Sequence, residues 1–214
     1  MLIATVLRSG SIYTPLWVQR LSAQCKRWAP PHEFVCLADC EIEGVKTIPL
    51  LHRWGGWWSK LELFRTDLFD QPVVYLDLDT LICGPLDDLF AVAASHEFTA
   101  LTDFYRGEGG IGSGVMGWRD QRRVSHLFEE FSDDPIGWQK RIGTRGDQGF
   151  IEENMDLGAI TRWQAAVPDQ IVSYKVHCRN GIPPDARVVC LHGRPKFADM
   201  RADDPVRLAW EQAA

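Results

Sequence analysis

The sequence predicts an α/β fold in which helices flank a mainly parallel sheet. Runs of consecutive apolar residues, such as LIATVL at residues 2–7 and VVYL at residues 73–76, are typical of strands buried on both faces, as in parallel sheets. Segments with a helical spacing of apolar residues alternate with these runs, which is the order expected when helices cover a sheet. The 214 residues, 45% of them hydrophobic, fit one domain with a sizeable core.

The predicted elements follow one another from the N-terminus. A strand at residues 2–7 precedes a helix over residues 15–28, in which Pro15 suits the first turn. Ser59 opens a second helix, and Glu62 three residues later predicts a capping box. Further strands are expected at residues 34–38, 45–48, 73–76, 98–102, 115–118 and 188–191, and further helices over about 122–131, from near Asp147, and over 205–213.

The net charge limits the classes of binding partner, and the cysteine content indicates the redox compartment of the protein. The net charge of −6 argues against broad binding to nucleic acid or to an anionic membrane surface. The six cysteines show no paired spacing typical of a zinc site, so we expect free thiols in a reducing cytoplasm. No segment reaches the roughly 18 consecutive apolar residues of a membrane helix. Residues 1–10 resemble a buried strand more than a signal peptide.

Two acids at the end of a buried strand are the strongest chemical feature. Asp77 and Asp79 follow VVYL, and open α/β sheets bind ligands at the carboxyl ends of their strands. Neighbouring carboxylates repel each other unless a positive charge joins them, and a hard divalent cation also bridges phosphates. The residues alone leave a second interpretation open, in which Asp77 caps a turn and Asp79 is solvated.

Phosphatases of the haloacid dehalogenase type use a related pattern, hhhhDxDxT, with an aspartate nucleophile after a strand. In this chain Thr80 directly follows Asp79 instead of standing one residue further on. The motif also lies in mid-chain and not near the N-terminus. Both differences argue against a phosphatase.

The segments around the two acids resemble glycosyltransferase family 8, in particular its glycogenin-like and galactosyltransferase-like members. In chain order the matching segments are WSKLELF at 58–64, VVYLDLDTLICGPLDDLF at 73–90, IGSGVMGW at 111–118, GDQGFI at 146–151 and HGRPK at 192–196. The resemblance covers about residues 2–200 and implies one GT-A domain over 1–214. Its donor-binding elements lie at about 2–120, and its Asp-Gln and His/Lys elements at about 140–200. It also implies transfer of a hexose from a UDP-sugar to an acceptor hydroxyl, with Mn²⁺ or Mg²⁺ and retention of configuration.

The resemblance assigns metal ligation to three residues. Asp77 and Asp79 match the family's metal-binding acids, and His192 is the expected third ligand. The family's His-x-x-Gly-x-x-Lys is altered here, since His192 directly precedes Gly193 and Cys190 stands at the position of the family's histidine. Because residues two apart on a strand point the same way, His192 is still expected to face the metal.

Five residues match donor-handling positions of the family. Lys60 matches a lysine that reaches the phosphates or the sugar, and its place near a predicted helix N-terminus suits anions. Asp103 matches an acid that hydrogen-bonds the donor sugar. Asp147 and Gln148 match a pair beneath the sugar ring, where they would stabilise the cationic transition state of glycosyl transfer. Lys196 matches a lysine that neutralises the departing diphosphate.

The remaining donor contacts are expected at the end of the first strand and in the glycine-rich segments. Tyr13 is a candidate to stack on the base. Gly112 replaces the family's sugar-contacting Asn, so the resemblance does not extend to a glucose or galactose preference. The other expected donor-binding residues are Thr5, Leu7, Arg8, Ser9, Leu78, Ser113 and Gly193.

Two other functions stay open. Sugar nucleotidyltransferases have related folds but use a Gly-rich loop after the first strand, where this chain has only residues 8–11, RSGS. An inactive sugar-nucleotide-binding scaffold is the third hypothesis, against which the intact acids argue. Trp54, Trp57 and Trp58 are expected to pack, with an acceptor-sugar surface or a peripheral membrane contact as alternatives. The sequence does not indicate the acceptor (glycan, lipid or protein) or the oligomeric state.

Overall fold

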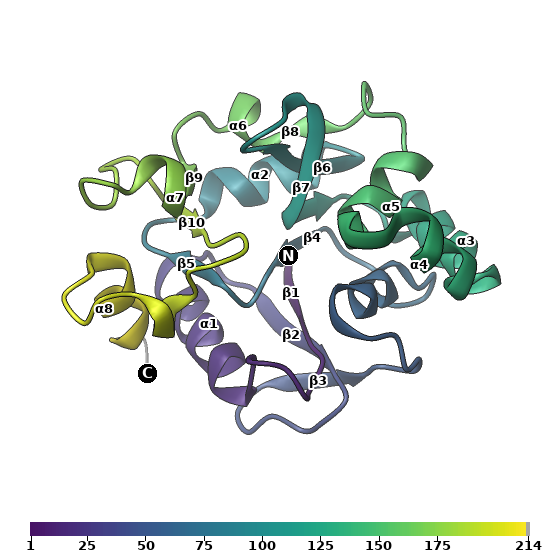
Figure 1. Ribbon diagram of the computed structural model, residues 1–214, viewed down its shortest axis with the longest axis horizontal. Helices are drawn as coiled ribbons and strands as arrows, with labels where there is room; N and C mark the ends of the chain where they lie inside the picture. Colours follow the sequence, from purple (N-terminus) through teal and green to yellow (C-terminus); the bar gives the residue numbers. More distant parts are fainter. Residues whose placement is uncertain (213–214) are drawn as a thin grey trace.

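The computed structural model describes residues 1–212 and is built on a seven-stranded sheet with the strand order β3-β2-β1-β4-β7-β6-β8 (Figure 1). Its strands are β1 Leu2–Leu7, β2 Glu33–Ala38, β3 Lys46–Pro49, β4 Val73–Leu76, β6 Phe98–Asp103, β7 Gly107–Trp118 and β8 Thr161–Arg162. A smaller sheet has the order β5-β10-β9, with β5 Thr80–Ile82, β10 Val188–Cys190 and β9 Ile171–Ser173.

Helices connect these strands. The α-helices are α1 Pro15–Trp28, α2 Asp87–Ser95, α3 Ser125–Asp133, α4 Pro135–Ile142, α5 Gly146–Asn154, α6 Trp163–Ala166, α7 Tyr174–His177 and α8 Pro205–Glu211. The 3₁₀-helices are η1 Gly56–Phe64, η2 Gln121–Arg123, η3 Gly143–Arg145 and η4 Phe197–Asp199. The predicted α/β class is confirmed.

The order of the strands reverses beside β1. β1 pairs in parallel with β2 on one side and with β4 on the other, so the chain fills one half of the sheet and then returns to build the second half. The carboxyl ends of β1 and β4 meet at this reversal, where open α/β sheets bind ligands. β7 runs antiparallel to β4 and β6, so the sheet is mainly, but not wholly, parallel.

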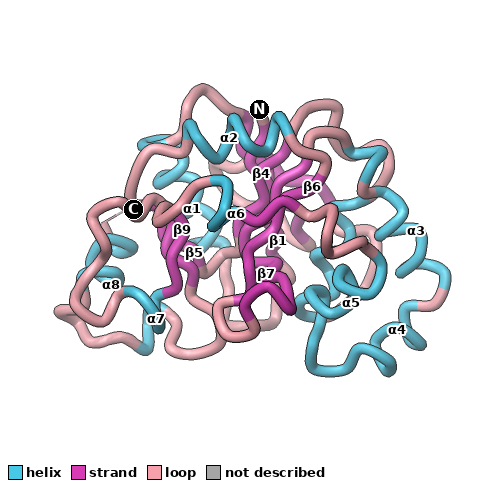
Figure 2. Tube along the Cα trace, turned by 90° about the horizontal axis from the view of Figure 1, so that it is seen from above, coloured by secondary structure: helices cyan, strands magenta, loops and turns pink. Residues whose placement is uncertain are grey.

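Apolar side chains fill both faces of the sheet, because alternate strand residues point to opposite sides. Val74 and Leu76 belong to the core shared with α1, α2 and the small sheet. Val73 and Tyr75 belong to the core shared with η1, α3 and α5. Figure 2 shows the strands in the middle of the molecule, with α3, α4 and α5 on one side and α1, α7 and α8 on the other.

The helix expected from Ser59 differs from the prediction. The segment is the 3₁₀-helix η1, which begins at Gly56, and the capping box does not form. Ser59 Oγ donates to the Gly56 carbonyl at 2.8 Å. The buried Glu62 carboxylate accepts the backbone N–H groups of Leu51 and His52 at 2.7 and 2.9 Å, because the preceding loop folds over it.

Most other predicted elements agree with the structure within a few residues. β7 is longer than the expected 115–118, because its glycine-rich first half forms a hairpin with β6. The elements that were not predicted are α2, α4, α6, α7, β5, β8, β9 and the short 3₁₀-helices η2, η3 and η4. The C-terminal helix ends at Glu211, and residue 213 of the predicted 205–213 lies outside the described residues.

Two sequence expectations concern the chain as a whole. All six cysteines are unpaired, as expected. Within residues 1–212, none of the helices has both the length and the apolar character that crossing a bilayer requires.

Candidate active site

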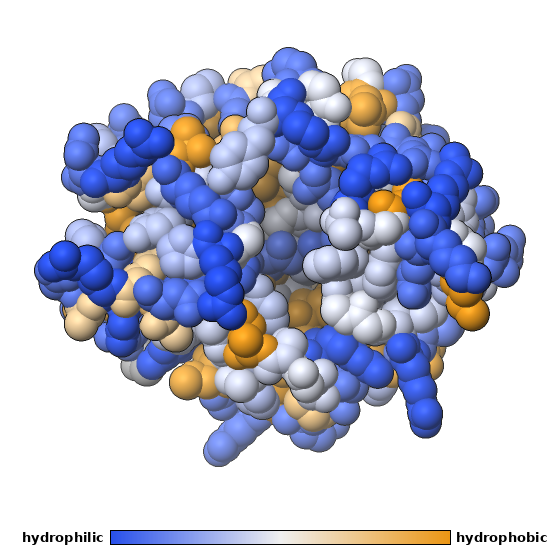
Figure 3. Space-filling view, viewed as in Figure 1, coloured by the Kyte–Doolittle hydropathy of each residue, from blue (hydrophilic) through white to orange (hydrophobic). Residues whose placement is uncertain are grey.

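A cleft of about 560 Å³ opens at the carboxyl ends of β1 and β4, and Figure 3 shows a hollow near the centre of this face. Its volume lies within the range of small-molecule sites. Most of the sequence-predicted site residues line it. These are Arg8, Tyr13, Lys60, Asp77, Leu78, Asp79, Asp103, Ser113, Asp147, Gln148, His192, Gly193 and Lys196.

Asp77 begins the loop that leaves β4, and its backbone fixes it to the neighbouring strand. Its N–H donates to the Gly114 carbonyl of β7 at 2.8 Å. Its carboxylate accepts the Tyr75 hydroxyl and lies 3.1 Å from the ammonium of Lys60. A Cβ on Gly114 would lie 3.2 Å from the Asp77 carboxylate, so a glycine there leaves room for the acid.

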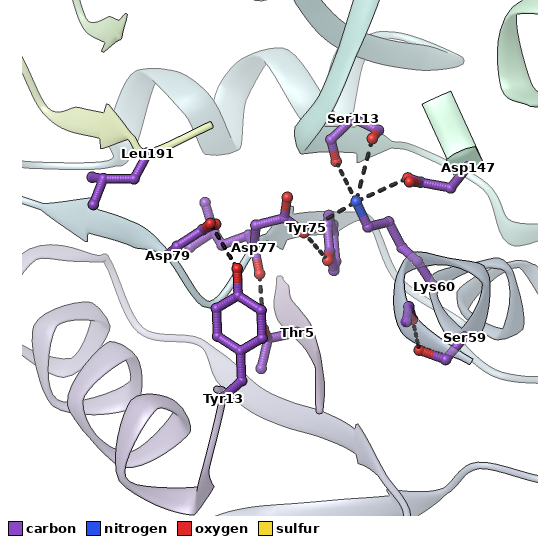
Figure 4. Close-up of polar contacts among 12 residues, drawn as sticks. Thr5, Tyr13, Ser59, Lys60, Tyr75, Asp77, Asp79, Ser113, Asp147 and Leu191 are labelled. Atoms are coloured by element: carbon purple, nitrogen blue, oxygen red, sulfur yellow. Dashed lines mark hydrogen bonds and ion pairs between the residues drawn. The ribbon is translucent and has the colours of Figure 1, made fainter. Parts of the chain in front are cut away.

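Lys60 crosses from η1 to join acids of two elements (Figure 4). It lies in the middle of η1 and not at a helix N-terminus. Its ammonium is 2.9 Å from Asp147 and 3.1 Å from Asp77, and 3.2 Å from the hydroxyl of Ser113. Burial alone would lower the pKa of Lys60, but Asp147 and Asp77 hold that pKa above its ordinary value. Lys60 is therefore a buried, charged lysine.

Asp79 has its own pair of partners. Its carboxylate accepts the Tyr13 hydroxyl at 2.9 Å and a hydrogen bond from the Lys196 ammonium. Burial and repulsion by Asp77 raise the pKa of Asp79, against the opposing effect of Lys196 and Tyr13. The Tyr13 hydroxyl thus binds an acid of the site, and stacking of its ring on a base stays a prediction.

Asp77 and Asp79 fit a divalent cation in their chemistry. Both present carboxylate oxygens to one cleft, and oxygen donors are what Mg²⁺ and Mn²⁺ prefer. Burial first, and then repulsion by Asp77, raise the pKa of Asp79, and a bound cation would relieve that repulsion. Within residues 1–212, however, no three acidic, histidine or cysteine side chains are grouped so that they could hold a metal by themselves.

His192 is not brought to the two acids. Its Nε2 lies 2.6 Å from the hydroxyl of Ser173, and its ring stacks on Phe104 with centroids 5.4 Å apart. Burial and the neighbouring Lys175 lower the pKa of His192. In this structure the ring of His192 therefore contacts Ser173 and Phe104, because β10 ends at Cys190 and the alternation of a strand does not continue to residue 192. Metal ligation by His192 stays a prediction.

Cys190 occupies the place that sequence reasoning gave to a histidine. It lines the cleft, and burial followed by the charges of Asp79 and Asp77 raises its pKa well above the ordinary value of a thiol. A protonated thiol is a poor metal ligand, since the thiolate is the ligating form. In this structure, burial and the two acids thus favour the protonated thiol at Cys190.

Asp103 and Gln148 form a second polar group in the lining of the cleft. Gln148 Nε2 donates to Asp103 at 3.0 Å, and Arg106 Nε donates to the same oxygen at 3.0 Å. Arg106 also forms an ion pair with Glu152 of α5. Burial alone would raise the pKa of Asp103, but backbone and side-chain hydrogen bonds from Arg106 and the N–H of Tyr105 hold that pKa below its ordinary value. Asp103 is therefore an ionised acceptor.

The end of β1 differs from the prediction at two positions. Thr5 donates its hydroxyl to the Leu76 carbonyl at 2.8 Å, and Leu7 is fully buried in the core. Both side chains point away from the cleft, because they share one face of the strand. Val6 points to the other face and lines the cleft, as does Arg8, whose guanidinium lies 3.5 Å from Asp39.

The structure explains why residue 112 is a glycine. A Cβ there would lie 3.2 Å from the side chain of Leu101, so an Asn would require Leu101 to move.

Sequence reasoning also missed Tyr75, Arg106 and Glu152. Tyr75 could have been found from its place two residues before Asp77 on one strand face. Arg106 lies three residues after Asp103 and binds it, whereas no local signal marks Glu152.

Comparison of the sequence with known protein families and with curated proteins gives no match. Solved structures do match. The glycosyltransferase GlyE of Streptococcus pneumoniae TIGR4 superposes with a TM-score of 0.73 and 14% identity over 99% of this chain, which covers 59% of the GlyE chain. The galactosyltransferase LgtC, solved with donor and acceptor sugar analogues, gives 0.68 and 14% identity over 100% of this chain and 95% of its own.

A third structure, mouse xyloside xylosyltransferase 1 in its apo form, gives a TM-score of 0.55 and 11% identity over 90% of this chain and 96% of its own. All three identities are low, so the likeness concerns the arrangement of the backbone. This arrangement has a mostly parallel seven-stranded sheet flanked by helices. The chain has the fold of the GT-A glycosyltransferases.

Proposed function

We propose that the chain is a glycosyltransferase that moves a hexose from a UDP-sugar to an acceptor hydroxyl, with retention at the anomeric carbon. The observation that carries the proposal is the pairing of Asp77 and Asp79 with two lysines at the reversal point of a GT-A fold. We infer that residues 1–214 act as one domain. The six unpaired cysteines support a cytoplasmic location, because thiols persist in reducing compartments.

Mn²⁺ or Mg²⁺ is part of the proposal. Asp77 and Asp79 would hold the cation, and the oxygens of the donor diphosphate would supply the ligands that the protein lacks. When bound, such a cation neutralises charge on the diphosphate leaving group.

Other residues of the cleft have distinct proposed roles in the transfer of the sugar. Lys196 lies beside Asp79, where its ammonium neutralises the negative charge that grows on the departing diphosphate. Lys60 holds Asp147 and Asp77 in fixed positions. Gln148 donates its amide N–H to Asp103, which leaves its carbonyl oxygen free for the sugar. The Asp147 carboxylate and this oxygen then stabilise the oxocarbenium-like charge at C1.

The structure of the first loop argues against a sugar nucleotidyltransferase. Such an enzyme would cradle phosphates in a loop after the first strand, with free backbone N–H groups. Here the N–H and the hydroxyl of Ser9 both bind the carboxylate of Asp39, at 2.9 and 2.7 Å. A carboxylate therefore already occupies part of the place that an incoming phosphate would need.

A nucleotide-release assay tests the proposal. The protein is incubated with a panel of UDP- and GDP-sugars, with Mn²⁺, with Mg²⁺ and with a chelator. We expect metal-dependent UDP release from one donor, and we expect Asp79→Ala to abolish it while circular dichroism stays unchanged. Formation of UTP from added pyrophosphate would instead identify a nucleotidyltransferase, and binding of a UDP-sugar without turnover would identify a scaffold. Wild-type turnover by Asp79→Ala would contradict the assignment of Asp79 as a metal ligand.

A further inference from the structure

Trp57 differs from the other two tryptophans of its loop. Trp54 and Trp58 are each 8% exposed and pack against Phe131 of α3, as expected of core tryptophans. Trp57 is 51% exposed and lines the cleft. Packing within the protein therefore accounts for two of the three side chains, and Trp57 is left facing solvent at the entrance to the site.

The indole of Trp57 rests on the first residue of α5. Gly146 has a φ of 61°, in the left-handed region that favours glycine. A Cβ at this residue would lie 2.7–2.9 Å from three atoms of the five-membered ring of Trp57. Such an approach excludes any side chain, so Gly146 both permits the backbone turn and supports the indole. The ring is thereby held in place while half of its surface stays open.

The geometry of η1 places the indole of Trp57 close to Asp147, which has a proposed role at the donor sugar. Residues three apart eclipse one another in a 3₁₀-helix, so Trp57 and Lys60 point to the same side. Lys60 reaches Asp147, at 2.9 Å, and Trp57 reaches Gly146, the residue immediately before it. The aromatic surface therefore lies one residue away from the carboxylate assigned to the donor sugar.

The polar side chains give the cleft two distinct ends. Figure 4 shows Tyr13 and Asp79 at one end and Lys60 with Asp147 at the other. Lys196 also binds Asp79, so the diphosphate charge belongs at the first end. Trp57 extends the second end outward to the surface, which leaves it beside the sugar and away from the diphosphate.

We propose that Trp57 is the platform on which a pyranose ring of a carbohydrate acceptor stacks; this rests on the proposed function. An indole offers a flat apolar face to the C–H groups of a sugar ring and an N–H donor to its hydroxyls, at a low cost in conformational entropy. A lipid surface is a poorer partner, because a single exposed indole on a chain of net charge −6 gains nothing from anionic headgroups. The ligand class is therefore a glycan presented with its terminal ring to the cleft.

The first test measures saccharide binding without any donor. Saturation-transfer NMR is recorded with lactose, maltose, cellobiose and methyl glycosides on the wild type, Trp57→Ala, Trp57→Phe and Leu51→Ala. Leu51 is a matched control, because it is 69% exposed just before the same loop and does not line the cleft. We expect saccharide signals from the wild type and Leu51→Ala, reduced signals from Trp57→Phe, and loss of them from Trp57→Ala.

The second test measures transfer with the donor that supports UDP release. We expect Trp57→Ala to raise the KM for the saccharide acceptor roughly 5- to 10-fold, as loss of one aromatic contact implies, while Leu51→Ala leaves both the acceptor KM and the slow release of UDP in water unchanged. Equal acceptor KM values for Trp57→Ala and the wild type would refute the platform, as would stimulation by peptides or lipid vesicles and not by saccharides. Saccharide binding that depends on Trp57, in a protein that releases no UDP from any donor, would instead refute the proposed function and leave the platform standing.

Discussion

Removing the charge of Lys60 should destabilise the protein more than any ordinary lysine substitution. In Lys60→Met the ammonium that joins Asp147 at 2.9 Å and Asp77 at 3.1 Å is lost, while both carboxylates remain. The side chain of Asp147 is 7% exposed and has no other cation within reach in the described structure, whereas that of Asp77 is 32% exposed and partly screened by water. Removing one partner of a buried pair costs about 3–5 kcal/mol. We expect about 3 kcal/mol, because only Asp147 is left fully uncompensated.

Urea unfolding followed by circular dichroism measures this loss. Lys46→Met is the matched control, since Lys46 pairs with Glu33 at the surface, with its side chain 63% exposed, and such pairs contribute about 0–1 kcal/mol. Adding Asp147→Asn to Lys60→Met should restore about 1–2 kcal/mol, because the amide removes the unpaired buried charge. A Lys60→Met variant as stable as Lys46→Met, or a double variant without any rescue, would refute the account of Lys60 as a buried charge bridge.

Three further predictions concern the polar groups of the cleft. The Lys196 ammonium binds the Asp79 carboxylate. Lys196→Met should therefore raise the affinity of the protein for Mn²⁺ in the absence of nucleotide, as measured by electron paramagnetic resonance, and should lower turnover. Unchanged Mn²⁺ affinity would contradict the pairing of Lys196 with Asp79. Arg106→Met should remove one hydrogen bond that holds Asp103 and thereby loosen Gln148, which binds the same carboxylate. A small misplacement of Gln148 should lower kcat on the order of 10-fold and leave the donor KM little changed. An effect confined to the donor KM would instead indicate that Arg106 contacts the donor directly. The pKa of Asp103 is lowered in the folded protein. The ionised carboxylate therefore stabilises the fold fully above its ordinary pKa of about 4, and this contribution is lost as pH falls through the lowered pKa. In urea unfolding, the difference in stability between the wild type and Asp103→Asn should shrink from pH 6 to pH 3.

The donor end of the cleft was predictable because its signals are local. Asp77 and Asp79 directly follow an apolar run, and a buried parallel strand has to end with its polar residues at the sheet edge. Asp103, the last residue of β6, and Asp147, in the first turn of α5, also lie at the ends of predicted elements. The apolar pattern placed these acids at element ends, whereas the family resemblance assigned Asp103 and Asp147 to the same site as Asp77 and Asp79.

The partners of these acids were harder to predict, because they depend on packing between distant segments. The prediction of a helix N-terminus at Lys60 failed because Glu62 binds the backbone of the preceding loop and leaves Ser59 without its reciprocal partner. The contacts of His192 with Ser173 and Phe104 were not predicted, because the prediction assumed a strand two residues longer than β10. Arg106 was missed although it lies three residues after Asp103 and binds it, because its second contact, with Glu152, depends on the approach of α5 to the β6–β7 turn.

On the proposed function, the charge of the cleft would favour binding of a cation together with a sugar nucleotide. The charged residues that line the cleft are four aspartates (Asp77, Asp79, Asp103 and Asp147) and four basic residues (Arg8, Lys60, Arg145 and Lys196), a net charge of 4 − 4 = 0. Each phosphate of a diphosphate would add a negative charge, so a donor bound alone would leave uncompensated negative charge in a partly buried cleft. A divalent cation bound with the donor would balance both phosphates and leave the net charge of the cleft unchanged. Asp77 and Asp79 would hold such a cation, and the Lys196 ammonium, which binds the Asp79 carboxylate in this structure, would then be available to the diphosphate. The Lys196–Asp79 pair would in that case be the resting arrangement of the charges that the proposed reaction uses.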